Sequence, residues 1–148
     1  SDRTETVLWR LQHGELDGIT PKLAVVMIGT NNTSMREDPP ENTAAGIQAI
    51  LTTLRTRLPQ TKILLLAVFP RGASADDPLR HVNQAVNDRL RAYADQRQVF
   101  FLDLGPRFLD AAGRISEDVM PDALHPSERG YRLWAEGMED TIRKLLGE

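Results

Sequence analysis

One group of small polar residues lies where it could stabilise the transition state of acyl transfer. Gly29, Thr30, Asn31 and Asn32 directly follow the apolar run 23–28. An asparagine amide at such a point can donate a hydrogen bond to the oxyanion that forms when an ester carbonyl is attacked. Glycine and asparagine also favour ordinary turns, so this local sequence leaves a simple strand-to-loop turn equally open.

A second group could supply proton transfer. Asp122 and His125 are three residues apart, and Pro121 and Pro126 flank the histidine segment. A histidine in this setting can act as a general base, and an acidic neighbour can fix its tautomer and stabilise the imidazolium ion. The alternative is an incidental histidine before a helix that Ser127 caps, although capping leaves Asp122 and His125 unexplained.

The elements that must position these residues follow from the apolar spacing. Helical spacing predicts helices over residues 4–12, 42–58, 78–96 and 127–146. Apolar runs at 23–28 and 62–69 predict strands buried on both faces, and a shorter run at 99–104 predicts a third. Trp9 and Trp134 fall on apolar helical stripes, which favours core packing for both.

Alternating helices and strands predict an α/β fold, a three-layer α/β/α sandwich with a parallel sheet. Active sites in such sheets lie beyond the carboxyl ends of the strands. Asn31 follows the first predicted strand, and His125 follows the third after a long irregular stretch. We therefore expect the two side chains to converge at one edge of the sheet.

Composition narrows the function classes. The 148 residues fit one domain, 1–148, and the net charge of −3 gives no electrostatic case for binding nucleic acid. There is no cysteine, no metal-binding spacing of histidines and acids, and no glycine-rich nucleotide loop, so we expect no cofactor and no metal. The longest apolar run is too short for a transmembrane segment, and the sequence assigns no compartment.

Several segments together resemble the SGNH/GDSL hydrolase superfamily. They are residues 6–17, Pro21-Lys22, 28–32, 69–72, 78–80 and 122–131, and they cover almost the whole chain in order. Within that superfamily the sequence is most similar to the catalytic subunits of platelet-activating-factor acetylhydrolase Ib and to bacterial acetylesterases. The resemblance implies a flavodoxin-like SGNH hydrolase fold.

The resemblance also implies roles for individual residues. Asn31 corresponds to the oxyanion donor of the family, His125 to the general base and Asp122 to the residue that orients the histidine. Thr30 and Leu124 correspond to positions that line a small acyl pocket. The implied activity is hydrolysis of a small acyl ester, most plausibly an acetyl ester and for example an acetylated carbohydrate.

The sequence departs from the family pattern in two features. The Gly-Asp-Ser block that carries the nucleophile is absent, and Ser1 stands where the family usually has a glycine whose backbone N–H completes the oxyanion hole. We therefore expect an N-terminally incomplete domain, with the first strand and the serine upstream or on a companion N-terminal fragment. The alternative is a catalytically inactive interaction module of the same fold, and the resemblance also allows a homodimer.

Overall fold

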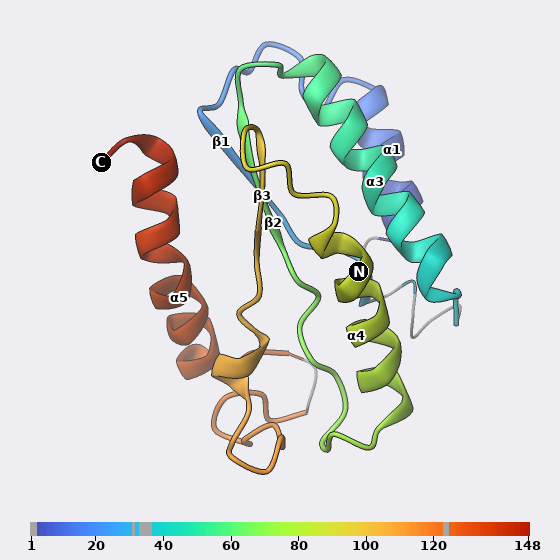
Figure 1. Ribbon diagram of the computed structural model, residues 1–148, viewed down its shortest axis with the longest axis vertical. Coiled ribbons are helices and arrows are strands. Elements are labelled where there is room, and N and C mark those ends of the chain that lie inside the picture. The colour runs from blue at the N-terminus through green and yellow to red at the C-terminus, as the bar shows by residue number, and fades with distance from the viewer. Residues whose placement is uncertain (1–2, 31, 33–36, 123–124) are drawn as a thin grey trace.

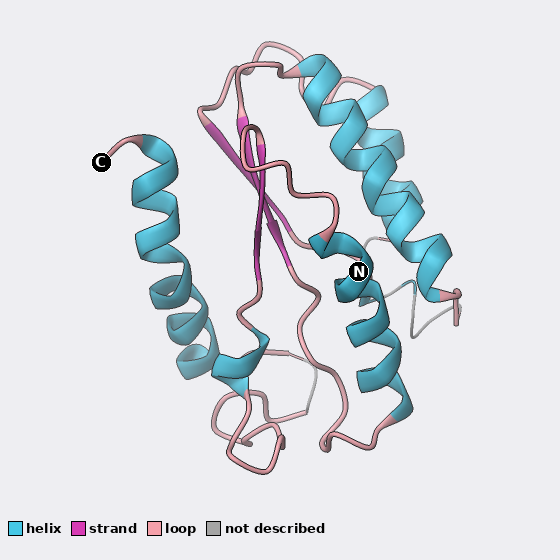
Figure 2. Ribbon diagram, in the orientation of Figure 1, coloured by secondary structure: helices cyan, strands magenta, loops and turns pink. Residues whose placement is uncertain are grey.

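A parallel sheet of three strands organises the fold. The computed structural model describes residues 3–30, 32, 37–122 and 125–148. Strands β1 (Leu23–Val26), β2 (Lys62–Leu66) and β3 (Val99–Leu102) lie side by side in the order β1-β2-β3 (Figures 1 and 2). All pairings are parallel, with Leu23 opposite Lys62 and Ile63 opposite Val99. The three carboxyl ends therefore meet at one edge of the sheet, the lower one in Figure 1.

Helices cover both faces of this sheet, as the predicted three-layer sandwich requires. Helices α1 (Thr4–Gln12), α3 (Pro40–Arg57) and α4 (Pro78–Arg91) lie on one side, and α5 (Glu128–Leu146) lies on the other (Figure 1). Strand β2 is the centre of the core. Ile63 and Leu65 pack against the first layer of helices, whereas Leu64 and Leu66 pack against the α5 side. The predicted burial of this strand on both faces is confirmed.

The prediction for the first strand was wrong in part. Strand β1 ends at Val26, and Val25 and Met27 are 42% and 39% exposed. Among the described residues β1 pairs only with β2, so it forms an edge of the sheet. Its apolar composition resembles that of the central strand β2, although β1 lies at the edge of the sheet. Sequence composition reported the apolar content of this run but not its place in the strand order.

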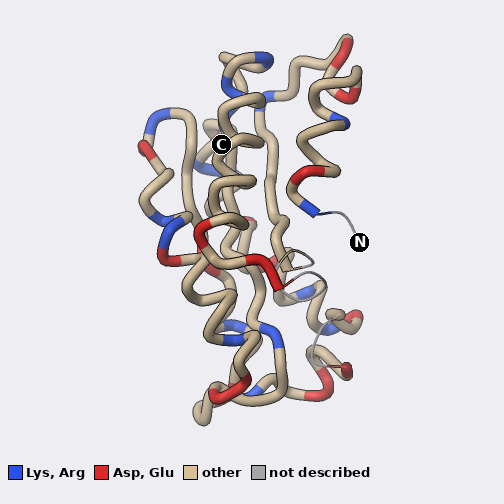
Figure 3. Tube along the Cα trace, turned by 90° about the vertical axis from the view of Figure 1, so that its right-hand side faces the viewer, with Lys and Arg blue, Asp and Glu red and all other residues tan. Residues whose placement is uncertain are grey.

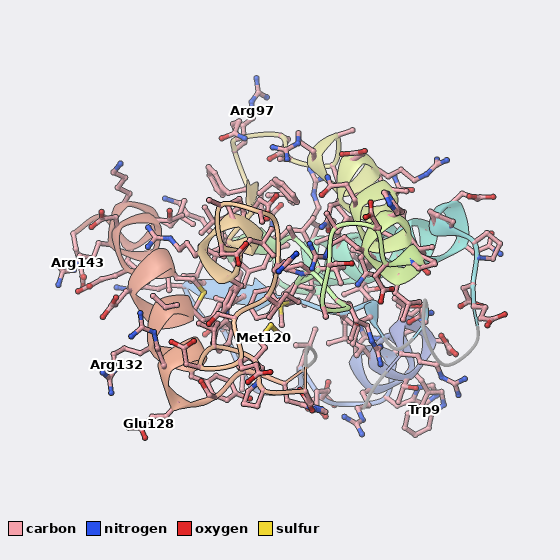
Figure 4. All side chains as sticks on the ribbon, turned by 90° about the horizontal axis from the view of Figure 1, so that it is seen from below. Trp9, Arg97, Met120, Glu128, Arg132 and Arg143 are labelled. Atoms are coloured by element: carbon pink, nitrogen blue, oxygen red, sulfur yellow. The ribbon has the colours of Figure 1, made fainter. Side chains whose placement is uncertain are left out.

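Trp9 also departs from the expectation of core packing. Its side chain is 60% exposed and lies at the periphery of the molecule (Figure 4), where its ring stacks on His13 with centroids 4.2 Å apart. Trp134, in contrast, packs on the α5 side of the sheet against Phe69. The stripe of α1 is short, and Leu11 is the apolar residue of this helix that is fully buried.

The end of α4 shows how a single side chain can set an element boundary. The helix was expected to reach residue 96 but ends at Arg91. Asp95 Oδ1 accepts hydrogen bonds of 2.9 Å from the backbone N–H groups of Arg97, Gln98 and Val99. These bonds lower the pKa of Asp95 to about 2. The carboxylate thus fixes a turn that leads directly into β3.

A short 3-10 helix, η1 (Gly105–Phe108), follows β3 within a stretch expected to be irregular. Charged residues of both signs are interspersed along the chain (Figure 3). No helix in the described part of the chain is long and apolar enough to cross a membrane.

Candidate active site

Three loops leave the carboxyl edge of the sheet, and the first contains Gly29. This glycine has φ +129°, and a β-carbon there would lie 3.1 Å from Thr43 Cγ2 on α3. The chain therefore needs glycine at this point both for its backbone conformation and for its close approach to α3. Thr30 follows, and Arg71 Nη1 lies 3.4 Å from both its carbonyl oxygen and its Oγ1.

The third loop brings Asp122 and His125 together. Asp122 Oδ2 lies 2.6 Å from His125 Nδ1, and Oδ1 of the same carboxyl group accepts a 2.6 Å bond from the backbone N–H of His125. Both side chains are exposed, by 74% for His125 and 55% for Asp122. An ionised carboxylate can only accept, so the contact places the proton of a neutral imidazole on Nδ1. Nε2 then carries the lone pair that a general base requires.

The start of α5 anchors this loop. Ser127 Oγ accepts from the N–H of Gly130 at 3.2 Å, which confirms the predicted N-cap, and it donates to the Asp118 carbonyl at 2.5 Å. The backbone N–H of Ser127 donates to the Val119 carbonyl at 2.8 Å. A β-carbon at Gly130 would lie 2.4 Å from that same carbonyl oxygen. The close approach holds the start of α5, which directly follows the histidine segment, against the turn that contains Val119.

The second loop, which leaves β2, is tied to the third by one side chain. The guanidinium group of Arg80 on α4 donates to the carbonyls of Arg71, Gly72 and Gly113 at 3.3, 2.8 and 2.7 Å. Burial lowers the pKa of Arg80, and the nearby Asp77 carboxylate opposes that shift. We call these four residues, Arg80 with Arg71, Gly72 and Gly113, the arginine bridge. It joins two of the three loops at the carboxyl edge.

A separate cavity of about 100 Å³ lies beside the arginine bridge. Its polar lining includes Arg80, Asn83, Gln84, Asn87 and Asp103, and it lies between α4 and the segment that contains η1. Within the described residues, no cluster of three histidines and acids could hold a metal ion.

The predicted site residues fall into two groups. Thr30, Asp122 and His125 are described, and each follows a strand at the expected edge of the sheet. Asn31, Ser1 and Leu124 lie outside the described residues. The expected convergence of Asn31 with His125 therefore stays a prediction, as do the catalytic roles of all these residues.

Asn32 is a polar residue of this region to which the sequence assigned no role. It is 1% exposed, and its side chain bonds to Thr4 on α1. Its burial had no signal in the sequence, because asparagine next to asparagine after a strand is typical of a surface turn.

Comparison with known proteins assigns the chain to a protein family. The sequence model of the GDSL-like Lipase/Acylhydrolase family matches residues 1–133. The chain is 39% identical over 148 residues to platelet-activating factor acetylhydrolase IB subunit alpha1 of Pongo abelii, and 40% identical over 148 residues to subunit alpha2 of Mus musculus. Each alignment covers 99% of the chain, which spans 62% and 63% of the length of these relatives.

Solved structures share the same architecture. A carbohydrate esterase family 3 protein from Talaromyces cellulolyticus superposes with a TM-score of 0.78 at 18% sequence identity. The superposition covers 99% of this chain and 70% of that one. At this identity the similarity shows the fold alone, and the fold agrees with the predicted SGNH hydrolase sandwich.

Proposed function

Because the chain belongs to the GDSL-like lipase/acylhydrolase family, we propose that it forms part of a serine ester hydrolase that acts on small acyl esters. The contact of 2.6 Å between Asp122 and His125 is the observation that carries this proposal. It supplies an oriented imidazole at the edge of the sheet where the fold places active sites. The nucleophile of the proposal is a serine in a segment that precedes residue 1.

The proposed reaction proceeds through an acyl-enzyme. The serine oxygen attacks the ester carbonyl carbon while His125 Nε2 accepts the hydroxyl proton, and a tetrahedral oxyanion forms. His125 then returns the proton to the leaving alcohol as the bond between the carbonyl carbon and the alcohol oxygen breaks. Water attacks the acyl-enzyme in the same way, its proton passes through His125 to the serine, and the acid is released. Asp122 stabilises the imidazolium ion in both halves.

The side-chain amide of Asn31 and the backbone N–H of Ser1 are the proposed donors to the oxyanion, together with the N–H of the nucleophile itself. Thr30 and Leu124 are proposed to border the acyl group. Two of the similar proteins are named as an acetylhydrolase and a carbohydrate esterase, which supports an acetyl group as the acyl half and a carbohydrate as one candidate for the alcohol half.

The test compares variants of the complete protein in an acetyl-ester assay. Asn31→Ala should lower kcat by about 100- to 1,000-fold, the usual cost of losing one oxyanion donor, with little change in melting temperature. His125→Ala should lower kcat at least as much, because the proposed reaction has no other described residue that accepts the proton of the serine hydroxyl group. His81→Ala is the matched control, since His81 is exposed on α4 and should leave kcat unchanged.

An organophosphonate probe tests the covalent step separately. The complete wild-type protein should be labelled on one serine, and labelling should slow sharply in His125→Ala. A wild-type protein that is folded but not labelled would instead favour a catalytically inactive interaction module. Unchanged kcat in Asn31→Ala would remove Asn31 from the oxyanion hole.

A further inference from the structure

Four polar residues form a cluster between the start of α1 and the segment after β1, and two of them are buried, one is half-buried and one is exposed. We call Asn32, Thr4, Glu5 and Asp38 the Asn32 cluster. Asn32 is 1% exposed and Thr4 is 4% exposed. Asn32 Oδ1 accepts from the backbone N–H of Thr4 at 2.9 Å. Asn32 Nδ2 donates to Thr4 Oγ1 at 3.0 Å and to Asp38 Oδ2 at 3.1 Å, and lies 3.4 Å from Glu5 Oε2.

The backbone of Asn32 also makes a hydrogen bond. Its carbonyl oxygen accepts from the N–H of Asp38 at 3.0 Å, so the two ends of segment 32–38 are joined. On the other side, Gly46 of α3 makes room for Thr4: a β-carbon at Gly46 would lie 2.4 Å from Thr4 Oγ1 and 2.7 Å from Thr4 Cβ. The contact between α1 and α3 therefore depends on this glycine, and it delivers Thr4 to Asn32.

We propose that Asn32 is a positioning residue of the oxyanion hole, which fixes the Asn31 segment relative to the start of α1. This inference rests on the proposed function, in which Asn31 and the N–H of Ser1 bind the same oxyanion. Asn31 is the neighbour of Asn32 in the chain, and Ser1 precedes Thr4 by three residues. The pair of bonds between Asn32 and Thr4 joins these two segments directly, although 28 residues separate them.

The chemistry of the cluster favours an amide over an apolar contact at this position. Two bonds in opposite directions between Asn32 and Thr4 fix both distance and orientation, whereas apolar packing would fix distance alone. An oxyanion hole needs that precision, because its donors must lie within a few tenths of an ångström of the developing charge. A satisfied buried amide therefore suits the support of such a hole.

The same geometry requires an amide rather than a carboxylate. Nδ2 faces the carboxylates of Asp38 and Glu5, and Glu5 is itself paired with Arg3 at 3.4 Å. In Asn32→Asp the introduced carboxyl group would keep the bond from the Thr4 N–H, but its second oxygen would need a proton to donate. Ionisation would place a third negative charge beside two others, so the arrangement would fail as the pH rises.

The experiment measures kcat per active site in the complete protein. Active sites are counted by organophosphonate titration run to completion, so that unfolded molecules do not contribute. Asn32→Ala and Gly46→Ala should lower kcat per titrated site roughly 10- to 100-fold, the scale of a small misplacement of catalytic groups, while KM changes less than about threefold. Gly46→Ala displaces Thr4 by contact with its Oγ1 and Cβ atoms and leaves the Asn32 side chain itself unaltered, so it perturbs the same cluster from a second position.

Thr61→Ala is the control for a merely structural role. Thr61 is 3% exposed and its hydroxyl bonds to the Pro21 carbonyl at 2.6 Å, at the opposite edge of the sheet. It should lower the melting temperature and leave kcat per titrated site unchanged. If Asn32→Ala behaves in the same way while Asn31→Ala loses activity, the positioning role is overturned and the proposed function stands. If Asn31→Ala also keeps full activity, the proposed oxyanion hole itself fails.

Asn32→Asp provides a readout that survives poor folding of the alanine variant. The ratio of its kcat per titrated site to that of the wild type should fall as the pH is raised from 5 to 9, because the introduced carboxyl group loses its proton. Taking the ratio removes the pH dependence that His125 gives to both proteins. A ratio of one across the whole range would overturn the inference.

Discussion

Replacement of Arg80 by alanine should destabilise the fold more than any other loss of a single arginine on α4. The guanidinium group of Arg80 bonds to the carbonyls of Gly113 at 2.7 Å, Gly72 at 2.8 Å and Arg71 at 3.3 Å. These carbonyls belong to two different loops. Alanine would therefore remove the arginine bridge and leave three acceptors without their donor.

The expected magnitude follows from the number and burial of these bonds. A hydrogen bond to a charged group contributes about 1.5–3 kcal/mol when water is excluded. All three bonds are only partly buried, so water can replace some of each, and the bond of 3.3 Å is weak. Counting about 1 kcal/mol for each of the two short bonds and less for the third gives a loss of about 2–3 kcal/mol.

Urea unfolding of the complete protein at pH 7 measures this loss. Arg89→Ala is the matched control on the same helix, because its contact with Glu41 is 3.9 Å long and both side chains are more than half exposed. Its cost should stay below about 0.5 kcal/mol. Arg80→Lys should recover less than half of the loss, since an ammonium group lacks the planar fork that reaches several carbonyls. Equal stability of Arg80→Ala and Arg89→Ala would refute the reasoning.

Two further predictions concern stability. Gly29→Ala should lower the free energy of unfolding, measured by thermal melting, by about 1–3 kcal/mol, because φ is +129° and the new β-carbon would lie 3.1 Å from Thr43 Cγ2. Gly18→Ala should lower it less, because φ is +75° but nothing lies within 4 Å of the new β-carbon. The reverse order would contradict the packing argument. Asp95→Asn should be less stable than wild type above pH 4, because the depressed pKa of about 2 means that the stabilisation is present above the ordinary value of 3.8 and is lost as the pH falls toward 2. Urea unfolding between pH 7 and 2 should show the difference narrowing, and a constant difference would exclude the carboxylate as its source.

The order of helices and strands was predictable because apolar spacing reports burial directly. Helix α1 begins and ends at the predicted residues, and Ser127 caps α5 as expected. Strand β1 shows the limit of this reasoning. An apolar run specifies a strand, but the order of strands in a sheet depends on contacts between distant segments. The exposure of Val25 therefore had no local signal.

The candidate site was predictable to the same extent. Asp122 and His125 lie three residues apart, so their contact is local and the loop chemistry suggested it. The Asn32 cluster joins residues 28 positions apart through a close approach of α1 and α3 at Gly46. Such a cluster depends on the packing of two helices, and a single sequence contains no record of that packing.

Asn87 on α4 restrains the movement of the chain where it leaves β2. Its side-chain amide accepts from the N–H of Val68 at 2.7 Å and donates to the carbonyl of Val68 at 3.0 Å, as the peptide group of a neighbouring strand would. The chain leaving β2 is thus hydrogen-bonded to a helix beyond the point where strand pairing stops. Any outward swing of that chain segment near Val68 has to break two buried bonds or take α4 with it.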